Sequence, residues 1–283
     1  MKELLLSTIQ NALKEDIGSG DYTSMACVKN TKNKKAQLIT KEDCIIAGVE
    51  LAKIIFLEAD DSLRIKILKK DGSRVKKNDM ILEISGSPLS ILKTERLVLN
   101  YMQRMSGIAT KTYELNEYIK HTKAKILDTR KTTPLNRLIE KWAVKIGGGI
   151  NHRFGLYDLI MIKDNHIDFS GGIKDAIKNC YEYLTEKKLD LKIIIEARNL
   201  KEVNKIIAYG GINRILLDNF SITETSKAVS VIKNKFEIES SGGITEKNIA
   251  NYANCGVDYI SVGCITHNVK SIDLSIIAIN EGN

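Results

Sequence analysis

The chain has 283 residues, of which 43% are hydrophobic and 28% charged, and its formal net charge is +8 at pH 7. These proportions are typical of a folded globular protein and exclude a disordered chain. The apolar runs are short and interrupted by charges, which excludes a membrane span, and the lysine-rich stretches lack interleaved aromatic residues, which argues against a nucleic-acid partner.

The cysteines and the first residues point to a reducing compartment. Five cysteines are scattered through the chain without a CxxC pair, a pattern that favours reduced thiols over a zinc site or a disulfide framework. The first eighteen residues carry acidic side chains at helical spacing, where a leader would have a long apolar run. We therefore expect a cytoplasmic protein.

The first part of the chain predicts a small domain of mixed helices and strands. Residues 3–14 have apolar positions at helical spacing, and a second helix is expected over 50–56. Strand-like runs separated by turn residues follow from 36 to 85, namely AQLIT, CIIAGV, LRIKIL and MILEIS. We expect residues 1–108 to form an N-terminal α/β sandwich domain with antiparallel strands.

Two helices are predicted after this region. The first runs over 87–105, with Ser87 as N-cap and Pro88 at the first helical position, where a missing N–H has no consequence. Gly107 is expected to end it in a left-handed conformation. A second helix is predicted over 110–121.

Repeated strand–helix units dominate the remainder. Six apolar runs end in polar or glycine-bearing residues and lead to amphipathic segments: KILD, LIMIK, IIIE, ILLD, FEIESSGG and YISVG. Such units predict a parallel sheet, either a barrel or a doubly wound sheet. A barrel is favoured because it brings all six strand ends to one mouth. We expect an irregular, incomplete (β/α) barrel over 109–269, and a C-terminal helix within 270–283, centred on 272–279, that packs against the first domain.

A set of basic residues follows three of the runs. Arg130 and Lys131 come after the first, His152 and Arg153 after a triple glycine, and Lys163 after the second. Arginine suits planar carboxylates and lysine supplies a point charge. The alternative is a set of ion pairs at the barrel rim. The convergence of five such residues favours a pocket for a small polyanion.

A second set follows the later runs. Carboxylates at Glu196 and Asp218 can hold sugar hydroxyls, place a magnesium ion or stabilise a developing cation. Ser241-Gly242-Gly243, before a helix expected near Thr245, and Gly263-Cys264 after the last strand suit phosphate.

The four histidines do not have zinc-site spacing. We assign His152 to substrate contact, whereas His166 is at least as compatible with a structural hydrogen bond.

The motifs as a set closely resemble the quinolinate phosphoribosyltransferase family. They are EDIGSGDYTS, ERLVLNYMQRMSGIAT, DTRKTTP, KWAVKIGGGINHRFGLYDLIMIKDNH, LLDN, ESSGGI and VDYISVGCITH, in this order up to about residue 275. The resemblance implies an N-terminal α/β sandwich joined to an irregular α/β barrel. It also implies a reaction of quinolinate with phosphoribosyl pyrophosphate and magnesium, giving nicotinate mononucleotide, pyrophosphate and CO2 in NAD synthesis.

The resemblance carries residue roles as well. It implies catalytic roles for Lys131, Lys163, Glu196 and Asp218, with Glu196 and Asp218 near the ribose and Mg²⁺. It implies a homodimer, or a higher oligomer, in which Arg96 reaches the neighbouring subunit's site. The implied substrate-binding positions are Arg96, Thr129, Arg130, Lys131, His152, Arg153, Lys163, Glu196, Asp218, Ser241, Gly242, Gly243, Gly263, Cys264, Ile265 and His267.

Two departures from the family pattern stand near these positions. Leu135-Asn136 follows Thr-Thr-Pro where the family often has Gly-Leu, and Arg198 stands where it often has a glutamate. Three alternatives remain open: a paralogue acting on another phosphoribosyl acceptor or serving molybdenum metabolism, a Schiff-base aldolase using Lys163, and a non-catalytic anion-binding protein.

Overall fold

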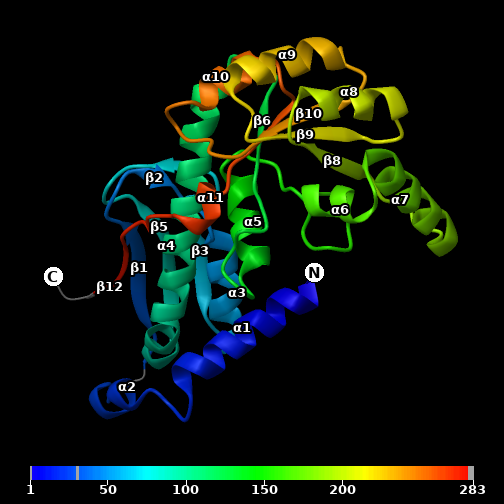
Figure 1. Cartoon of the computed structure of the whole chain (residues 1–283). Helices are drawn as coiled ribbons and strands as arrows, with labels where there is room; N and C mark the ends of the chain where they lie inside the picture. The colour runs from blue at the N-terminus through cyan, green and yellow to red at the C-terminus, as the bar shows by residue number, and fades with distance from the viewer. Residues whose placement is uncertain (1, 30–31, 280–283) are drawn as a thin grey trace. The chain divides into compact units, whose positions relative to one another are not determined.

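A computed structural model describes residues 2–29 and 32–279, which form two compact units (Figure 1). Of these residues, the first unit contains 2–113, 133–148 and 268–279, and the second contains 114–132 and 149–267. The domain boundary at residue 108 stays a prediction. The compact units are discontinuous in sequence, so each is described separately.

The first unit is built on a four-stranded antiparallel sheet in the order β12-β1-β5-β3. Alternate residues of the central strands are buried, and Leu38 of β1 lies opposite Leu82 of β5, both with no exposed surface. The strands are β1 (Lys34–Thr40), β3 (Arg64–Ile67), β5 (Met80–Gly86) and β12 (Leu274–Ile279), and a short ladder joins β2 (Cys44–Ile45) to β4 (Arg74–Val75).

The C-terminal segment corrects a prediction. The expected helix over 272–279 is instead the strand β12, which runs antiparallel to β1 from Thr40↔Leu274 to Lys35↔Ile279. The apolar residues of so short a segment fit either period, and its isoleucines favour a strand beside an open sheet edge. The remainder of the predicted helix, 280–283, lies outside the described residues.

Helices accompany this sheet. They are α1 (Lys2–Ile17), α2 (Tyr22–Cys27), α3 (Val49–Ala59), α5 (Arg137–Ile146) and α4 (Pro88–Ile119), of which α4 begins in the first unit and ends in the second. Predicted helices over 3–14 and 50–56 are confirmed as α1 and α3.

The predicted break at Gly107 is wrong, because α4 is one continuous helix of 32 residues. Gly107 serves close packing rather than termination. A Cβ at this position would lie 2.2 Å from the carbonyl oxygen of Lys270 and 2.8 Å from Cγ1 of Val269. Glycine is therefore required where the C-terminal segment passes against the helix.

The second unit contains the six predicted strands, all parallel, in the order β6-β11-β10-β9-β8-β7. Among the described residues no ladder joins β6 to β7, so the sheet is an incomplete barrel as expected. All five residues of β8 are buried, which is typical of a parallel strand covered on both faces. The strands are β6 (Lys125–Leu127), β7 (Ile160–Ile162), β8 (Ile193–Ala197), β9 (Arg214–Asp218), β10 (Glu237–Ser241) and β11 (Tyr259–Ser261).

Helices follow the strands in turn, and Figure 1 shows α7, α8 and α9 packed successively beside the sheet. The helix expected near Thr245 begins at Ile249, because Asn248 accepts the Thr245 amide N–H in a turn before it. The helices are α6 (Asp164–Phe169), α7 (Ile173–Lys187), α8 (Leu200–Tyr209), α9 (Ile222–Ile232), α10 (Ile249–Asn254) and α11 (Cys264–His267).

A buried ion pair in the first unit holds the loop that follows the Arg130-Lys131 segment. The carboxylate of Glu140, which has no exposed surface, accepts a hydrogen bond from Arg104 Nε at 2.8 Å and the Thr133 amide N–H at 3.3 Å. Leu135 in this loop has φ +63° and is 96% exposed. The backbone thus keeps the left-handed conformation that the family's glycine suits, although leucine occupies the position.

We expect Leu135→Gly to stabilise the protein. Relief of left-handed strain of about 1–2 kcal/mol, less the added unfolded-state entropy of glycine, should raise the free energy of unfolding by about 0.5–1 kcal/mol. Urea unfolding at fixed protein concentration measures the difference. The control is Leu135→Ala, which keeps the Cβ and hence the strain. Equal stability of the glycine and alanine variants would contradict the prediction.

Candidate active site

A cavity of about 750 Å³ lies at the carboxyl ends of the parallel strands in the second unit. Residues at or just beyond the carboxyl end of each of the six strands contribute to its wall, as expected when parallel strand ends meet at one face. The sequence-predicted residues that line it are Thr129, Arg130, Lys131, His152, Arg153, Lys163, Glu196, Asp218, Ser241, Gly242, Gly243, Gly263, Cys264 and His267.

One wall of the cavity is cationic. Burial, and then the like charge of Arg130, lower the pKa of Arg153 below its ordinary value. Two guanidinium groups close enough to repel each other are stabilised when an anion binds between them. Lys131 is held beside them, because Thr266 Oγ1 donates a hydrogen bond to its carbonyl oxygen at 2.8 Å.

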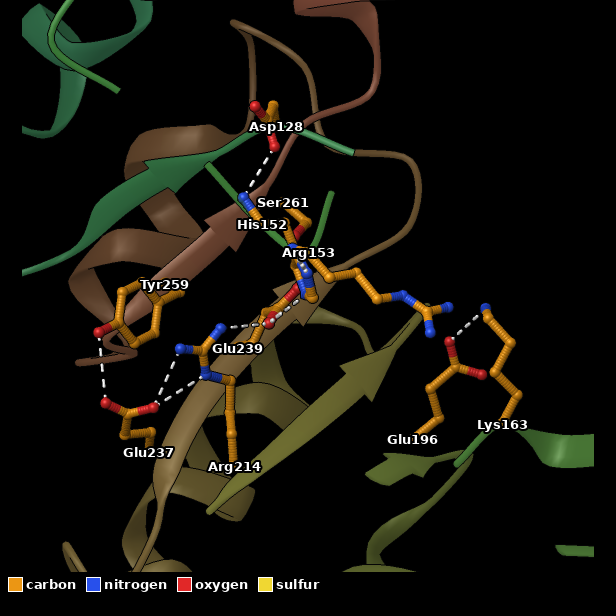
Figure 2. A network of polar contacts seen from close by, with 10 residues as sticks. All are labelled: Asp128, His152, Arg153, Lys163, Glu196, Arg214, Glu237, Glu239, Tyr259 and Ser261. Atoms are coloured by element: carbon orange, nitrogen blue, oxygen red, sulfur yellow. Dashed lines mark hydrogen bonds and ion pairs between the residues drawn. The ribbon is translucent and has the colours of Figure 1, made fainter. Parts of the chain in front are cut away.

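His152 lies in the cavity wall, where its ring and its backbone are both held by neighbouring residues. Its Nδ1 accepts the Arg153 backbone N–H at 2.6 Å, an arrangement that fits the tautomer with the ring proton on Nε2. Nε2 faces the Glu239 carboxylate at 3.3 Å (Figure 2). The His152 backbone N–H donates to Asp128 at 2.8 Å, which fixes the start of this turn. The side chain is only 7% exposed.

Lys163 and Glu196 form an ion pair across adjacent strands. Lys163 Nζ donates to Glu196 Oε1 at 2.7 Å, and the lysine side chain is 45% exposed against 9% for the glutamate. His166 accepts the Lys163 backbone N–H at 2.9 Å and does not line the cavity. Its observed role is therefore the structural hydrogen bond considered from the sequence.

The anionic and glycine-bearing wall is shaped by Asn219. This residue has φ +54°, and its amide donates to Asp218 Oδ2 at 2.9 Å. A Cβ on Gly242 would lie 2.1 Å from Asn219 Oδ1, so only glycine fits there. Gly243, at φ +62°, faces open space. At Gly242 and Gly243 the cavity is therefore bordered by backbone atoms.

Sequence reasoning missed several lining residues. Glu239 and Asn219 carry the most chemistry, and both could have been found. Glu239 precedes Ser241 by two residues and so shares its face of the strand, and Asn219 directly follows Asp218. The missed residues are Met161, Leu216, Asn219, Glu239, Ile244, Thr245 and Ser261.

Three positions named from the sequence lie elsewhere. Arg96 is exposed on α4 in the first unit, and Ile265 is fully buried within α11, so their roles stay predictions. Arg198, which reverses a family charge, pairs with Asp168 at 2.9 Å and with Glu202 at 2.7 Å. Its hydrogen bonds to Glu202 and then Asp168 raise its pKa. The reversed charge is thus matched locally.

Two carboxylates of the cavity are candidate ligands for a metal ion. Among the described residues, no group of three or more His, Cys, Asp or Glu side chains is arranged to hold a metal ion. Glu196 and Asp218 both line the cavity. Such a pair suits Mg²⁺, which binds proteins through one or two carboxylates and takes its other ligands from substrate phosphates and water.

In residues 2–29 and 32–279, no helix has the length and apolar character to cross a membrane.

Two family models match nearly the whole chain. The model described as quinolinate phosphoribosyl transferase, C-terminal domain, matches residues 108–277, and the N-terminal domain model matches residues 21–106. The chain belongs to the quinolinate phosphoribosyltransferase family. Most of each unit of the structure thus falls within stretches that this family shares.

Individual members of the family are similar over most of their length. An Arabidopsis thaliana protein named nicotinate-nucleotide pyrophosphorylase [carboxylating], chloroplastic, is 42% identical over 96% of this chain and 82% of its own. A Bacillus subtilis protein named probable nicotinate-nucleotide pyrophosphorylase [carboxylating] is 39% identical over 93% and 89%. The solved nicotinate-nucleotide pyrophosphorylase from Francisella tularensis has a TM-score of 0.93 and 38% identity, covering 99% of this chain and 97% of that one.

Proposed function

We propose that this chain transfers the phosphoribosyl group from phosphoribosyl pyrophosphate to quinolinate and removes one carboxyl group. The products are nicotinate mononucleotide, pyrophosphate and CO2, in a step of NAD biosynthesis. The relatives' names refer to this activity. The observation that carries the proposal is one cavity with four cations beside two carboxylates, at Arg130, Lys131, Arg153, Lys163, Glu196 and Asp218.

The cationic wall suits quinolinate, a planar pyridine with two adjacent carboxylates. Arg130 and Arg153 can each hold a carboxylate through two parallel hydrogen bonds, and each arginine then gains an anion that screens it from the other. Lys131 and Lys163 add point charges. Their catalytic contribution is to hold the ring nitrogen towards the ribose and to balance the dianion.

The opposite wall suits the phosphoribosyl donor. As pyrophosphate leaves, positive charge develops at ribose C1, and the carboxylates of Glu196 and Asp218 can stabilise it. The backbone at Gly242 and Gly243 allows a phosphate to approach without meeting a side chain. Predicted phosphate contacts at Ser241, Gly263, Cys264 and Ile265 complete this proposal.

Loss of the carboxyl group needs no separate electron acceptor from the protein. Attack by the pyridine nitrogen on C1 makes the nitrogen quaternary and positive. The electron pair left at the neighbouring carbon when CO2 departs is stabilised by that charge until the carbon takes up a proton from water. The residues of this chain hold the second carboxylate and orient the ring during this step.

Magnesium is part of the proposal. Glu196 and Asp218 would hold the ion together with substrate oxygens, since the cavity offers carboxylates and leaves space for phosphate ligands. Bound there, Mg²⁺ would neutralise charge on the departing pyrophosphate.

We also propose a homodimer in which Arg96 reaches the neighbouring subunit's quinolinate site. The exposure of Arg96 on α4 supports this, because a cation without a role in its own cavity is available to a second chain. A cytoplasmic location is proposed on the basis of the five cysteines, all of which are free.

Formation of nicotinate mononucleotide tests the function. Purified protein with quinolinate, phosphoribosyl pyrophosphate and Mg²⁺ should yield the mononucleotide and pyrophosphate in equal amounts. Chromatography of the reaction mixture measures both products. Nicotinate in place of quinolinate controls for the second carboxylate and should give far less product. Failure to form product with quinolinate would refute the assignment. Borohydride trapping of an adduct on Lys163 would instead support a Schiff-base enzyme.

A further inference from the structure

Glu239 is a buried carboxylate at the border of the cavity that the proposed mechanism does not use. It lies on the central strand β10 and has no exposed surface. An isolated carboxylate so placed would be strongly destabilising, so its partners indicate what holds it there.

Three side chains from three segments surround the Glu239 carboxylate. Arg214 Nη1, from the adjacent strand β9, donates to Oε2 at 2.9 Å, and Ser261 Oγ, from β11 on the other side, donates to Oε1. The His152 ring contacts Oε2 at 3.3 Å from the cavity side. Figure 2 shows these groups around the glutamate.

The charge balance favours an ionised Glu239. Burial by itself would raise its pKa, but His152, Ser261 and Arg214 more than offset burial and lower it. Arg214 is shared with Glu237, which it contacts at 3.0 Å, and its guanidinium also lies 3.8 Å from the Tyr259 ring centroid. Arg214 is therefore anchored independently of His152.

The His152 ring connects Glu239 to the part of the cavity where the substrate is proposed to bind. Its Nε2–H faces the carboxylate, while its Nδ1 accepts the backbone N–H of Arg153. The ring thus joins a fixed buried anion to the backbone of a cavity arginine. Figure 2 shows the Arg153 side chain extending from this point towards the Lys163–Glu196 pair.

We propose that Glu239 is a positioning residue for substrate, which holds the His152 ring in one tautomer and orientation and thereby sets the Arg153 guanidinium for a pyridine carboxylate. The inference rests on the proposed function. Its role is on the quinolinate side of the cavity, so loss of the carboxylate should weaken quinolinate binding and leave binding of the phosphoribosyl donor nearly unchanged.

Glu239→Gln tests the proposal, with Glu237→Gln as the matched control. Both positions lie on β10 and contact Arg214, but only Glu239 contacts His152. In Glu239→Gln the Arg153 guanidinium, a charged hydrogen-bond donor, should be misplaced. The dissociation constant and the KM for quinolinate should therefore rise by about tenfold or more. The KM for phosphoribosyl pyrophosphate should change by less than about twofold, as should every constant of Glu237→Gln.

Nitrogen NMR of the imidazoles provides a readout that a merely structural role would not alter. The chain has only four histidines, so the His152 signals can be assigned by comparison with His152→Gln. The native protein and Glu237→Gln should show His152 in the tautomer with the proton on Nε2. In Glu239→Gln we expect exchange between the two tautomers. Should this variant not fold, Glu239→Asp keeps the charge for Arg214 but withdraws the carboxylate from the ring, and its quinolinate affinity should fall.

The outcomes separate the two claims. No mononucleotide from the native protein would refute the proposed function. If the native protein is active and folded Glu239→Gln or Glu239→Asp binds quinolinate as the native protein does, the positioning role is wrong and the function stands. Equal losses for both substrates, or the same loss in Glu237→Gln, would also overturn it, since they indicate general disturbance of the barrel.

Discussion

Replacing Lys163 with alanine is expected to lower kcat/KM for quinolinate by about a thousandfold. Lys163 is ion-paired with Glu196 at 2.7 Å, and Glu196 is almost completely buried. The variant loses a charge that faces the substrate dianion and leaves a buried carboxylate without its cation. Removal of one group that stabilises charge beside the reacting atoms typically lowers the rate by about a hundred- to a thousandfold.

Steady-state kinetics with quinolinate as the varied substrate measures this effect. Lys178→Ala is the matched control, because Lys178 is an exposed lysine of α7 that pairs with Glu182 at 3.5 Å and does not line the cavity. It should retain native kinetics, as exposed pairs contribute little. A loss below about tenfold in folded Lys163→Ala would show that the lysine is peripheral to the reaction.

Subunit mixing should reveal whether Arg96 serves a second chain. Arg96→Ala and Lys163→Ala should each be inactive alone. In a heterodimer of the two, one site combines the Lys163 of the first variant with the Arg96 of the second and contains neither lesion. Random exchange makes half of the dimers heterodimers, so activity should recover to about a quarter of the native value.

A double variant supplies the control for this experiment. Lys163→Ala mixed with Arg96→Ala/Lys163→Ala forms no site that contains Lys163, so activity should not return. The exchange itself can be verified by mass spectrometry of differently tagged chains. Absence of recovery in verified heterodimers would place Arg96 in its own subunit's site or outside the site altogether.

Much of the site could be predicted because the carboxyl end of each of the six strands is marked in the sequence by polar or glycine residues after an apolar run. Apolar runs ending at Glu196, Asp218 and Ser241 bring their polar residues to one face whenever the strands are parallel. The family resemblance then supplied the substrate. The positions of these residues follow from local sequence pattern and from one rule of topology, without any contact between side chains.

Other features depend on contacts between distant residues. Gly107 has the pattern of a helix terminator, but its role is set by residues 269 and 270, far along the chain. The orientation of the His152 ring depends on the hydrogen bond that its Nδ1 accepts from the Arg153 backbone N–H, and the importance of Glu239 depends on partners from β9 and β11. Neither periodicity nor composition reports such pairings.

The edge strand β12 has a consequence for the independence of the first unit. Its hydrogen bonds to β1 come from the far end of the chain, and α5 of the same unit comes from the middle. An N-terminal fragment ending near residue 113 would therefore expose the backbone edge of β1 and lack one of its helices. An open strand edge of this kind readily pairs with other chains. The first unit thus requires β12, and it can become native only after residues 274–279 have been synthesised.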